Sequence, residues 1–554
     1  MARTALALRE AESAAGRLRS ELAAGDEAAT RSAGSRLAEQ ADVARRHSDG
    51  WGFAALTHLP VVGDDVDAVR RVARSVDVLG ADALPPALGV LETVRGGGLR
   101  SEDGGIRLDT LASVSGPVTE AHDASTRADR AVAGVRSDRL VGPLSGPVAD
   151  LQQQVQELDR SLGAAEKAVE LLPAMLGAGD RREYLLVVQN NAEIRSTGGL
   201  PGSLSVLRAE DGRVELGKQG NASLFGLSAD PVARLTPDEV DLYGRNVALD
   251  LRDTNLIPDF PRAASLMARF AEQRGQQVDG VVSVDPVTLA EVLRATGPVE
   301  AGGVRLDADN APRLLLNEPY QRLRSNEEQD AYFQEVSRGI LDALLSGQGD
   351  QLELVRVLSQ AAQQRRFLVW SDSDDEQRRI EDTPIAAALP RDEGISPSVG
   401  LYLNDSTRAK IQYYLRYDAD IRSLGCTAAG RQQVVAEMEL RSDVPDDVAR
   451  LTEFVTGDGT YARKGDDAMN LRLYAPTEGR LQALTVDGEP AGIKVGQDGD
   501  RQVSVLPLTL RPGESVRVRA LFETRPGQIG DPSLQWTPSM EWGPTRATAR
   551  NLCG

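Results

Sequence analysis

Hydrophobic positions in the first third of the chain recur every three or four residues. This spacing places them along one face of a helix. The segment Val148–Leu172 keeps a strict alternation of three and four over three heptads, which is typical of a helix packed in a coiled coil or long bundle. Glycine clusters at 96–98 and 104–105 predict a loop that interrupts the helices. We therefore predict a helical stalk or bundle over residues 1–172.

After Pro173 short apolar runs alternate with helical periodicity. Tyr184–Val188, Ser203–Leu207 and Val281–Val284 are predicted strands, and the residues after Asp259 are a predicted helix. Strands that alternate with helices indicate a layered α/β domain, which we place over residues 173–393.

The last segment, residues 394–554, shows a period of two. Val434, Ala436, Met438 and Leu440 are separated by single residues, as in a strand with one buried face. Several such strands with Gly, Pro and Asp at the turns predict an antiparallel β-sandwich. The predicted fold class is an α+β multidomain protein with a helical bundle or coiled-coil stalk, an α/β layered domain and a β-sandwich.

Charge and composition narrow the range of functions that this chain can have. The 554 residues include 63 Lys and Arg against 83 Asp and Glu, a formal charge of −20, which argues against a general nucleic-acid binder. No apolar run reaches the roughly 18 residues of a membrane span, and no signal peptide is evident. All three histidines lie in the first quarter, so Ser-His-Asp triads and His-rich zinc sites are excluded from later segments.

Two cysteines, Cys426 and Cys553, lie in the last quarter of the chain. They form either a disulfide or two free thiols. A disulfide would indicate an oxidising compartment.

The most unusual stretch, Gln189–Gly202, follows a predicted strand and concentrates amides, a charge pair and glycines. Glycines let the backbone approach a ligand closely, and free N–H groups beside Arg195 could hold an oxyanion. A tight polar turn between two strands is the alternative, because neither GxxxxGK[ST] nor GxGxxG is present after the strand. The candidate ligand-binding residues here are Asn190, Asn191, Thr197, Gly198 and Gly199.

A second stretch, Asp250–Phe260, places carboxylates near a helix start. Asp253 and Asp259 could coordinate a hard cation such as Mg²⁺, with Arg252 on a phosphate. For Asp259 a helix N-cap is the favoured explanation, whereas Asp253 and Asn255 have no such routine explanation. In a third stretch, Tyr320–Gln329, Arg322 and Arg324 either add positive potential to an anion site or belong to a solvated loop.

Four stretches together resemble the bacterial domain-of-unknown-function 4012 family: Gln189–Gly202, Asp253–Pro261, Val278–Pro298 and Ser398–Tyr414. The resemblance implies an extracytoplasmic cell-envelope protein, often with an N-terminal membrane helix before the stalk. We expect that helix to lie upstream of residue 1.

The α/β segment also resembles the LytR-CpsA-Psr family, which transfers lipid-pyrophosphate-linked glycopolymers onto the cell wall. Ile194–Thr197, Asn255, Ala295–Val299 and Gln329 are similar to its strand-end and helix-start residues, although the Arg-Asp pair after its second strand is absent. This likeness implies that Arg195, Arg252 and Arg322 or Arg324 bind pyrophosphate, and that Asp253 or Asp259 binds Mg²⁺.

Three hypotheses follow. The first is an envelope protein that binds a polyprenyl-pyrophosphate-linked glycan and that, in the fullest version of this hypothesis, is a phosphotransferase. In it Arg195 and Arg252 are electrostatic stabilisers and Asp253 is a metal ligand. The second is a non-catalytic scaffold in surface-polysaccharide assembly, which contacts a lipid-linked glycan or cell-wall polymer through its stalk and sandwich. The third is a soluble cytosolic protein, for which two free thiols would be expected.

Overall fold

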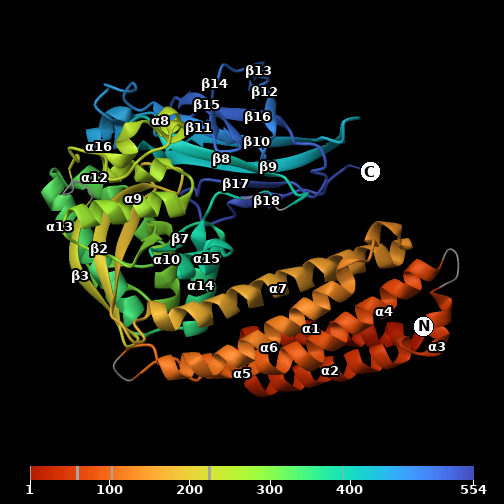
Figure 1. Ribbon diagram of the computed structural model, residues 1–554. Coiled ribbons are helices and arrows are strands. Elements are labelled where there is room, and N and C mark those ends of the chain that lie inside the picture. The colour runs from red at the N-terminus through yellow and green to blue at the C-terminus, as the bar shows by residue number, and fades with distance from the viewer. Residues whose placement is uncertain are drawn as a thin grey trace. The chain divides into compact units, whose positions relative to one another are not determined.

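The computed structural model describes residues 2–57, 62–101, 104–221, 226–390, 392 and 394–553. They form two compact units (Figure 1). The first comprises residues 1–180 and 210–213, and the second comprises residues 181–209 and 214–554. The predicted α+β multidomain class, with helices first and strands last, is confirmed.

Long helices lie side by side in the first unit (Figure 1). Helix α6 (Leu108–Ala133) shows why they pack, because its buried residues Leu111, Val114, Val118 and Ala121 recur at intervals of three or four residues. The other elements of this unit are α1 (Ala2–Ala24), α2 (Glu27–Ser48), α3 (Trp51–Leu56), α4 (Gly63–Val78), the π-helical turn η1 (Leu79–Ala83), α5 (Leu84–Arg95), η2 (Ser137–Arg139) and α7 (Gly142–Met175).

The heptad segment forms most of α7, which packs on α6. Val148 and Val155 are buried, whereas Leu158 of the same seam is 40% exposed. Polar pairs supplement the apolar contacts, since His122 Nδ1 lies 2.6 Å from Glu166 Oε2 across the two helices.

A five-stranded sheet of order β3-β2-β1-β4-β7 is the centre of the α/β part of the second unit. Strand β1 pairs antiparallel with β2 and parallel with β4, and β4 pairs antiparallel with β7. The strands are β1 (Arg182–Asn190), β2 (Leu200–Glu210), β3 (Arg213–Asn221), β4 (Gly280–Val284) and β7 (Phe367–Ser371), and a separate hairpin is formed by β5 (Val299–Ala301) and β6 (Val304–Leu306).

Helices with apolar faces accompany this sheet. Helix α9 (Phe260–Gln273) buries Phe260, Met267 and Phe270 in one core with Leu185 and Val281 of the sheet. The remaining elements are α8 (Pro237–Tyr243), η4 (Arg245–Ala248), η5 (Leu251–Leu256), α10 (Pro286–Thr296), α11 (Ala311–Leu316), α12 (Glu318–Arg322), α13 (Asn326–Leu345), α14 (Gln351–Gln363), α15 (Asp374–Glu381) and η6 (Pro384–Ala386).

Two sheets form the sandwich, with orders β13-β12-β16-β10-β9 and β14-β15-β11-β8-β17-β18. Their pairs are antiparallel except that β17 runs parallel to β8 within the described strands. The elements are β8 (Ser398–Asp405), η7 (Ile411–Tyr414), β9 (Leu415–Cys426), β10 (Gln432–Ser442), η8 (Val448–Arg450), α16 (Glu453–Thr456), β11 (Asp467–Tyr474), β12 (Arg480–Val486), β13 (Glu489–Pro490), β14 (Lys494–Asp498), β15 (Arg501–Leu510), β16 (Ser515–Glu523), β17 (Ser533–Trp536) and β18 (Arg546–Thr548).

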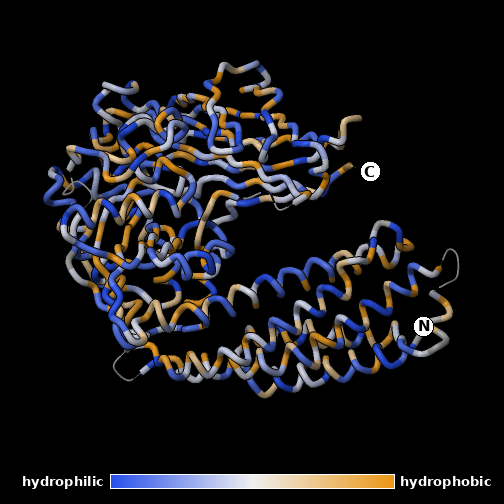
Figure 2. Tube along the Cα trace, viewed as in Figure 1, coloured by the Kyte–Doolittle hydropathy of each residue, from blue (hydrophilic) through white to orange (hydrophobic). Residues whose placement is uncertain are grey.

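The two sheets enclose one hydrophobic core, to which β10 contributes Val434, Ala436, Met438 and Leu440. From Ala436 to Leu440 the buried residues of β10 alternate with more exposed ones, as expected for a strand with one buried face, and Figure 2 shows hydrophobic and hydrophilic residues mixed through the sandwich. A second cluster joins Tyr402 and Tyr474, on the opposite face of the six-stranded sheet, to Leu242 and Leu266 of the α/β part. The sandwich and the α/β layers therefore share a packed interface.

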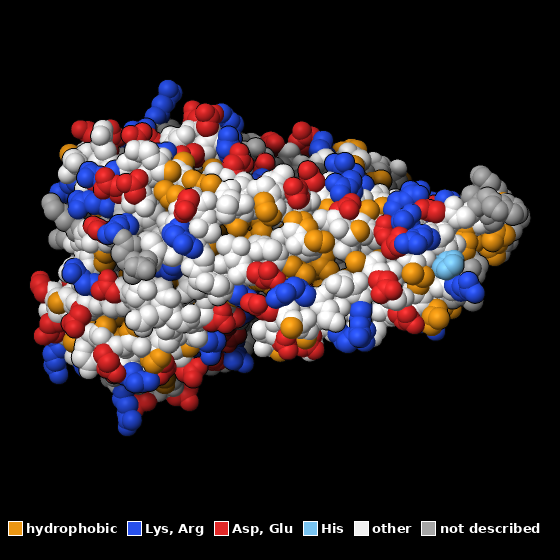
Figure 3. Space-filling view, turned by 90° about the horizontal axis from the view of Figure 1, so that it is seen from below, with side chains coloured by type: hydrophobic (Ala, Val, Ile, Leu, Met, Phe, Trp, Pro, Cys, Tyr) orange, Lys and Arg blue, Asp and Glu red, His pale blue; other side chains and the backbone are white. Residues whose placement is uncertain are grey.

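Surface charge is mixed in sign on the face of the helices seen in Figure 3, where Arg and Lys side chains lie among Asp and Glu. Ion pairs such as Arg31–Glu92 and Arg45–Asp77 join neighbouring helices. None of the helices in the described part of the chain has the length and apolarity that crossing a membrane requires.

Candidate functional site

The glycine-rich segment Gln189–Gly202 connects β1 to β2 and is buried over residues 191–199. Ile194 leaves the α/β sheet altogether and packs in the core of the sandwich. The backbone around Ile194 is also bound to the sandwich. Asp405 N donates to Ile194 O at 2.9 Å, and Ser196 N donates to Asn404 Oδ1 at 2.9 Å. The segment is thus a buried link between the sheet and the sandwich.

Gln189 organises the polar groups of this link. Its Oε1 accepts hydrogen bonds from Thr197 Oγ1 (3.1 Å), Gly199 N (2.9 Å) and Asn255 Nδ2 (3.0 Å), and its Nε2 donates to Ser283 Oγ at 2.8 Å. Asn255 also donates to Gly199 O at 2.9 Å. The structure therefore brings Thr197, Gly199 and Asn255 together around a side chain of the protein itself.

Glycine at position 199 is explained by a close approach of the backbone. A Cβ atom there would lie 2.4 Å from both C and O of Asn190, so no other residue fits without a backbone shift. Gly198 has a φ of +135°, which also favours glycine. Both positions therefore need glycine because of the backbone conformation of this turn.

Asn190 and Asn191 point to different partners. Asn190 Nδ2 donates to the hydroxyl of Tyr320, and Asn190 Oδ1 accepts from Ala192 N at 3.0 Å. Asn191 Nδ2 donates to Asp285 Oδ2 at 3.0 Å, where Arg366 Nη1 also binds at 2.6 Å. Asp285 is the N-cap of α10, since its Oδ1 accepts from Thr288 N at 2.8 Å.

Arg195 is 5% exposed and lies between two carboxylates. Its Nη2 is 3.0 Å from Glu193 Oε1 and its Nη1 is 3.6 Å from Asp405 Oδ2. Lys410 pairs with the other oxygen of Glu193. Burial opposes ionisation of Glu193, yet Lys410 and Arg195 outweigh it and hold the Glu193 pKa below its usual range. The guanidinium charge is therefore balanced inside the protein.

Arg252 and Asp253 lie at the edge of this cluster. Arg252 makes a bidentate pair with Asp250, with Nε–Oδ1 at 3.0 Å and Nη2–Oδ2 at 2.6 Å, while its side chain stays 45% exposed. Burial raises the pKa of Asp253, and the positive charge of Arg195, followed by that of Arg252, opposes the rise. The structure thus places Arg195, Arg252 and Asp253 within electrostatic reach of one another.

Asp259 caps α9. Its Oδ2 accepts from Arg262 N at 3.3 Å, which is the bond of a helix N-cap, and its Oδ1 accepts from Leu389 N at 2.8 Å. Of the two roles predicted for Asp259, the structure therefore shows the N-cap. Burial raises its pKa. Within the described residues no group of three or more His, Cys, Asp or Glu side chains is arranged to hold a metal ion.

The third predicted group lies around the start of α13. Arg322 Cζ lies 5.8 Å from the centre of the Tyr332 ring, Arg324 N donates to Glu328 Oε2 at 2.8 Å, and Gln329 Nε2 donates to Leu323 O at 3.4 Å. Their side-chain contacts among the described residues do not join them to Arg195 or Arg252. Tyr320, which binds Asn190, is the link between this segment and the first.

Although Gln189 and Glu193 lie in the stretch Gln189–Gly202 that was singled out from the sequence, several residues that organise the site were not among the candidate site residues. They are Gln189, Glu193, Asp285, Arg366, Asp405, Lys410 and Gln412. One signal was available, because a charged or amide side chain that ends an apolar strand or precedes one, such as Asp405 or Arg366, is costly to bury without a partner.

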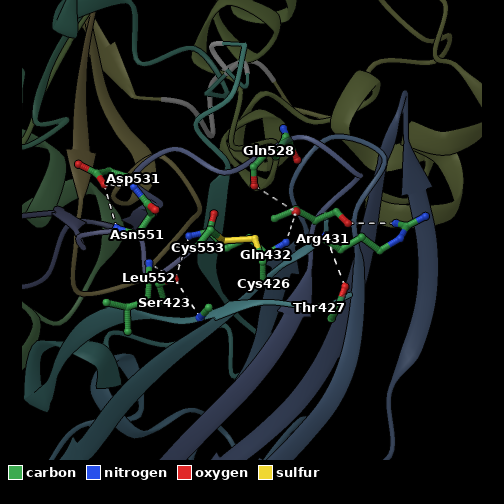
Figure 4. The surroundings of a disulfide bond; sticks show 12 residues. Ser423, Cys426, Thr427, Arg431, Gln432, Gln528, Asp531, Asn551, Leu552 and Cys553 are labelled. Atoms are coloured by element: carbon green, nitrogen blue, oxygen red, sulfur yellow. Dashed lines mark hydrogen bonds between the residues drawn. A yellow bond between two sulfur atoms is a disulfide. The ribbon is translucent and has the colours of Figure 1, made fainter. Parts of the chain in front are cut away.

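Cys426 and Cys553 form a disulfide that joins the end of β9 to the C-terminal segment (Figure 4). Leu552 N donates to Ser423 Oγ at 3.2 Å and Asn551 N donates to Asp531 Oδ1 at 2.8 Å. The bond therefore holds the last described residues against β9, together with these hydrogen bonds.

The fold and the site define a two-unit α+β protein whose α/β sheet and β-sandwich are joined by buried polar contacts. Residues 179–320 match the model of a family described as a protein of unknown function, DUF4012. The match spans β1 to β6 and α8 to α12, and it confirms the family resemblance over that part of the chain. No curated protein matches the chain.

Proposed function

We propose that this protein is a non-catalytic scaffold of the cell envelope that takes part in surface-polysaccharide assembly. The observation that carries the proposal is the internal neutralisation of Arg195 by Glu193 and Asp405. A guanidinium that serves a pyrophosphate must present its donors to the ligand, whereas here Nη1 and Nη2 donate to Ile194 O and Glu193 Oε1.

The backbone of the glycine-rich segment leads to the same proposal. Gly199 N and Ser196 N donate to Gln189 and Asn404, so these two N–H groups are used within the protein. Anion cradles of the phosphate-binding type need such N–H groups to be free. The segment instead contributes rigidity, because its contacts fix the α/β sheet and the sandwich as one body.

Placement in the envelope is supported by the disulfide. Disulfides persist in oxidising compartments and are rare where thiols are kept reduced. Both cysteines of the sequence take part in the bond, so a thiol titration of the native protein should detect no free thiol. Two reactive thiols would favour the cytosolic hypothesis.

Binding of a polyprenyl-pyrophosphate-linked glycan is the second candidate function. It is favoured by one observation, the 45% exposure of the Arg252 side chain beside Asp253 and Arg195. A pyrophosphate that bound the Nε and Nη2 edge of Arg252 would have to displace Asp250, which already accepts hydrogen bonds from both atoms.

The two functions are separated by calorimetric titration of the intact protein with farnesyl pyrophosphate, with and without Mg²⁺. The scaffold predicts no saturable heat and no difference between wild type and Arg252→Ala. The exposed arginine Arg517 of β16, paired with Glu439 on the neighbouring strand β10, provides the matched control Arg517→Ala. Saturable binding that is lost in Arg252→Ala and kept in Arg517→Ala would replace the scaffold with the second candidate.

A further inference from the structure

Arg472 is a buried cation at the interface between the sandwich and the α/β layers. It lies on β11 between Leu471 and Leu473, whose side chains belong to the sandwich core. Because side chains alternate along a strand, Arg472 points to the opposite face, where Tyr402 and Tyr474 pack against the α/β part. Arg472 is 6% exposed.

Arg472 differs from the other buried arginines in its hydrogen bonds. Arg366 and Arg501 each make four through their guanidinium nitrogens and pair with Asp285 and Asp392. Arg365 makes three, all to oxygen acceptors, and Arg195 makes two, one of them to Glu193. Arg472 makes one, from Nη2 to Leu242 O at 2.9 Å, and its Nε and Nη1 have no acceptor among the described residues.

The surroundings of Arg472 do not supply a compensating charge. Its guanidinium lies 5.1 Å from the centre of the Tyr243 ring, which offers only a partial, quadrupolar attraction. Asp498 accepts the hydroxyl of Tyr474 at 3.0 Å rather than pairing with Arg472. Burial lowers the pKa of Arg472. Tyr243 and Tyr474 oppose this shift, and the positive charge of Arg195 adds to it. A buried guanidinium without a counter-charge lowers the stability of the folded state. The free energy lost when a charge leaves water is recovered only through a well-placed partner of opposite charge.

We propose that the free Nε–H and Nη1–H groups of Arg472 bind a small inorganic anion, a halide or an oxyanion, enclosed between the six-stranded sheet and the α/β layer. The anion would supply the missing acceptor and the missing negative charge together. Tyr243, Tyr402 and Tyr474 are all buried around this face, so a ligand small enough to be enclosed on folding suits the site. This site is separate from the function proposed above and does not depend on it.

The test is the thermal unfolding of the intact protein at constant ionic strength, with sodium gluconate replaced stepwise by sodium chloride or by sodium phosphate. Because a ligand that binds only the folded state stabilises it, the Tm of the wild type should rise with the concentration of one of these anions. In Arg472→Met the rise should vanish. A response to chloride identifies a halide site, and a response to phosphate identifies an oxyanion site.

The control variant is Arg517→Met, which removes the same side chain from an exposed position and should keep the wild-type response. Equal anion responses in wild type and Arg472→Met would overturn the proposal. Should Arg472→Met fail to fold, wild-type crystals grown in bromide decide the question. An anomalous peak within hydrogen-bond distance of Arg472 Nε or Nη1 supports the site for halides. Crystals that lack this peak, together with a phosphate-insensitive wild-type Tm, would overturn it.

Discussion

Asp405 and Asp467 are two carboxyl groups buried in the sandwich and bound to the same amide. Gln412 Nε2 donates to Oδ1 of each, at 2.7 Å in both cases. Burial raises the pKa of Asp467 to about 8, and the neighbouring Asp405 adds to the rise. Asp467 is therefore protonated in the folded protein at neutral pH, whereas it is ionised in the unfolded chain.

This difference predicts a pH-dependent loss of stability. Because the folded-state pKa lies above the unfolded-state value, the contribution of Asp467 is fully present below about pH 4 and declines as the pH rises towards 8. Asp467→Asn mimics the protonated acid and should remove that decline. We expect the variant to be more stable than wild type at pH 8 by on the order of 5 kcal/mol, and nearly equal at pH 4.

Urea unfolding at pH 4, 6 and 8 measures the difference. The exposed pair-forming residue Asp443 gives a control, because Asp443→Asn should not increase stability between pH 4 and 8. A stability gap between wild type and Asp467→Asn that stays constant over this range would show that Asp467 is ionised in the folded state.

At the scale of elements, the C-terminal strand β18 is short and lies at the edge of its sheet. It pairs with β17 over Arg546 to Thr548, and the Cys426–Cys553 bond follows five residues later. The bond joins residues 127 apart in the sequence. A covalent closure of so long a loop restricts the unfolded chain strongly.

Removal of the bond should destabilise the second unit. We expect Cys426→Ser with Cys553→Ser to lower the free energy of unfolding by about 2–4 kcal/mol and to speed amide exchange in β18 before other strands. Hydrogen exchange of the oxidised wild type and the double variant provides the measurement. If β18 exchanges at the same rate in both proteins, the bond does not hold this strand.

The types of most elements could be predicted from the sequence because they depend on local periodicity. The heptads of α7, the strand Tyr184–Val188 and the alternation in β10 are all read from neighbouring residues. The site could be predicted only in part, because its partners come from distant segments. Arg195 and Asp405 are 210 positions apart, and no local pattern indicates that one neutralises the other. The parallel pairing of β17 with β8 also depends on contacts between segments that are far apart in the sequence.

At the scale of the whole molecule, helices α1 to α7 belong to one compact unit, whereas the α/β layers and the sandwich form the other. The two segments 173–393 and 394–554 share the core cluster around Tyr402 and Tyr474, and Ile194 of the first packs into the core of the second. We therefore expect these two segments to unfold together.

Calorimetry should detect this organisation as two transitions. Val132→Ala in α6 and Val434→Ala in β10 each remove methyl groups from fully buried positions, at a cost of about 2 kcal/mol. The first should lower only the transition of the helical unit, and the second only the transition of the other unit. A shift of both transitions by either variant would mean that the whole chain unfolds as one unit.

The central claim is that Arg195 is a structural ion-pair partner rather than a ligand-binding group. The unfolding free energy of Arg195→Met tests it most directly, because truncation leaves the buried Asp405 without its cationic partner and leaves Glu193 with Lys410 alone. We predict a loss of about 3–5 kcal/mol, against less than about 1 kcal/mol for the exposed control Arg517→Met. An Arg195→Met protein as stable as wild type would contradict the claim and return Arg195 to the candidates for ligand binding.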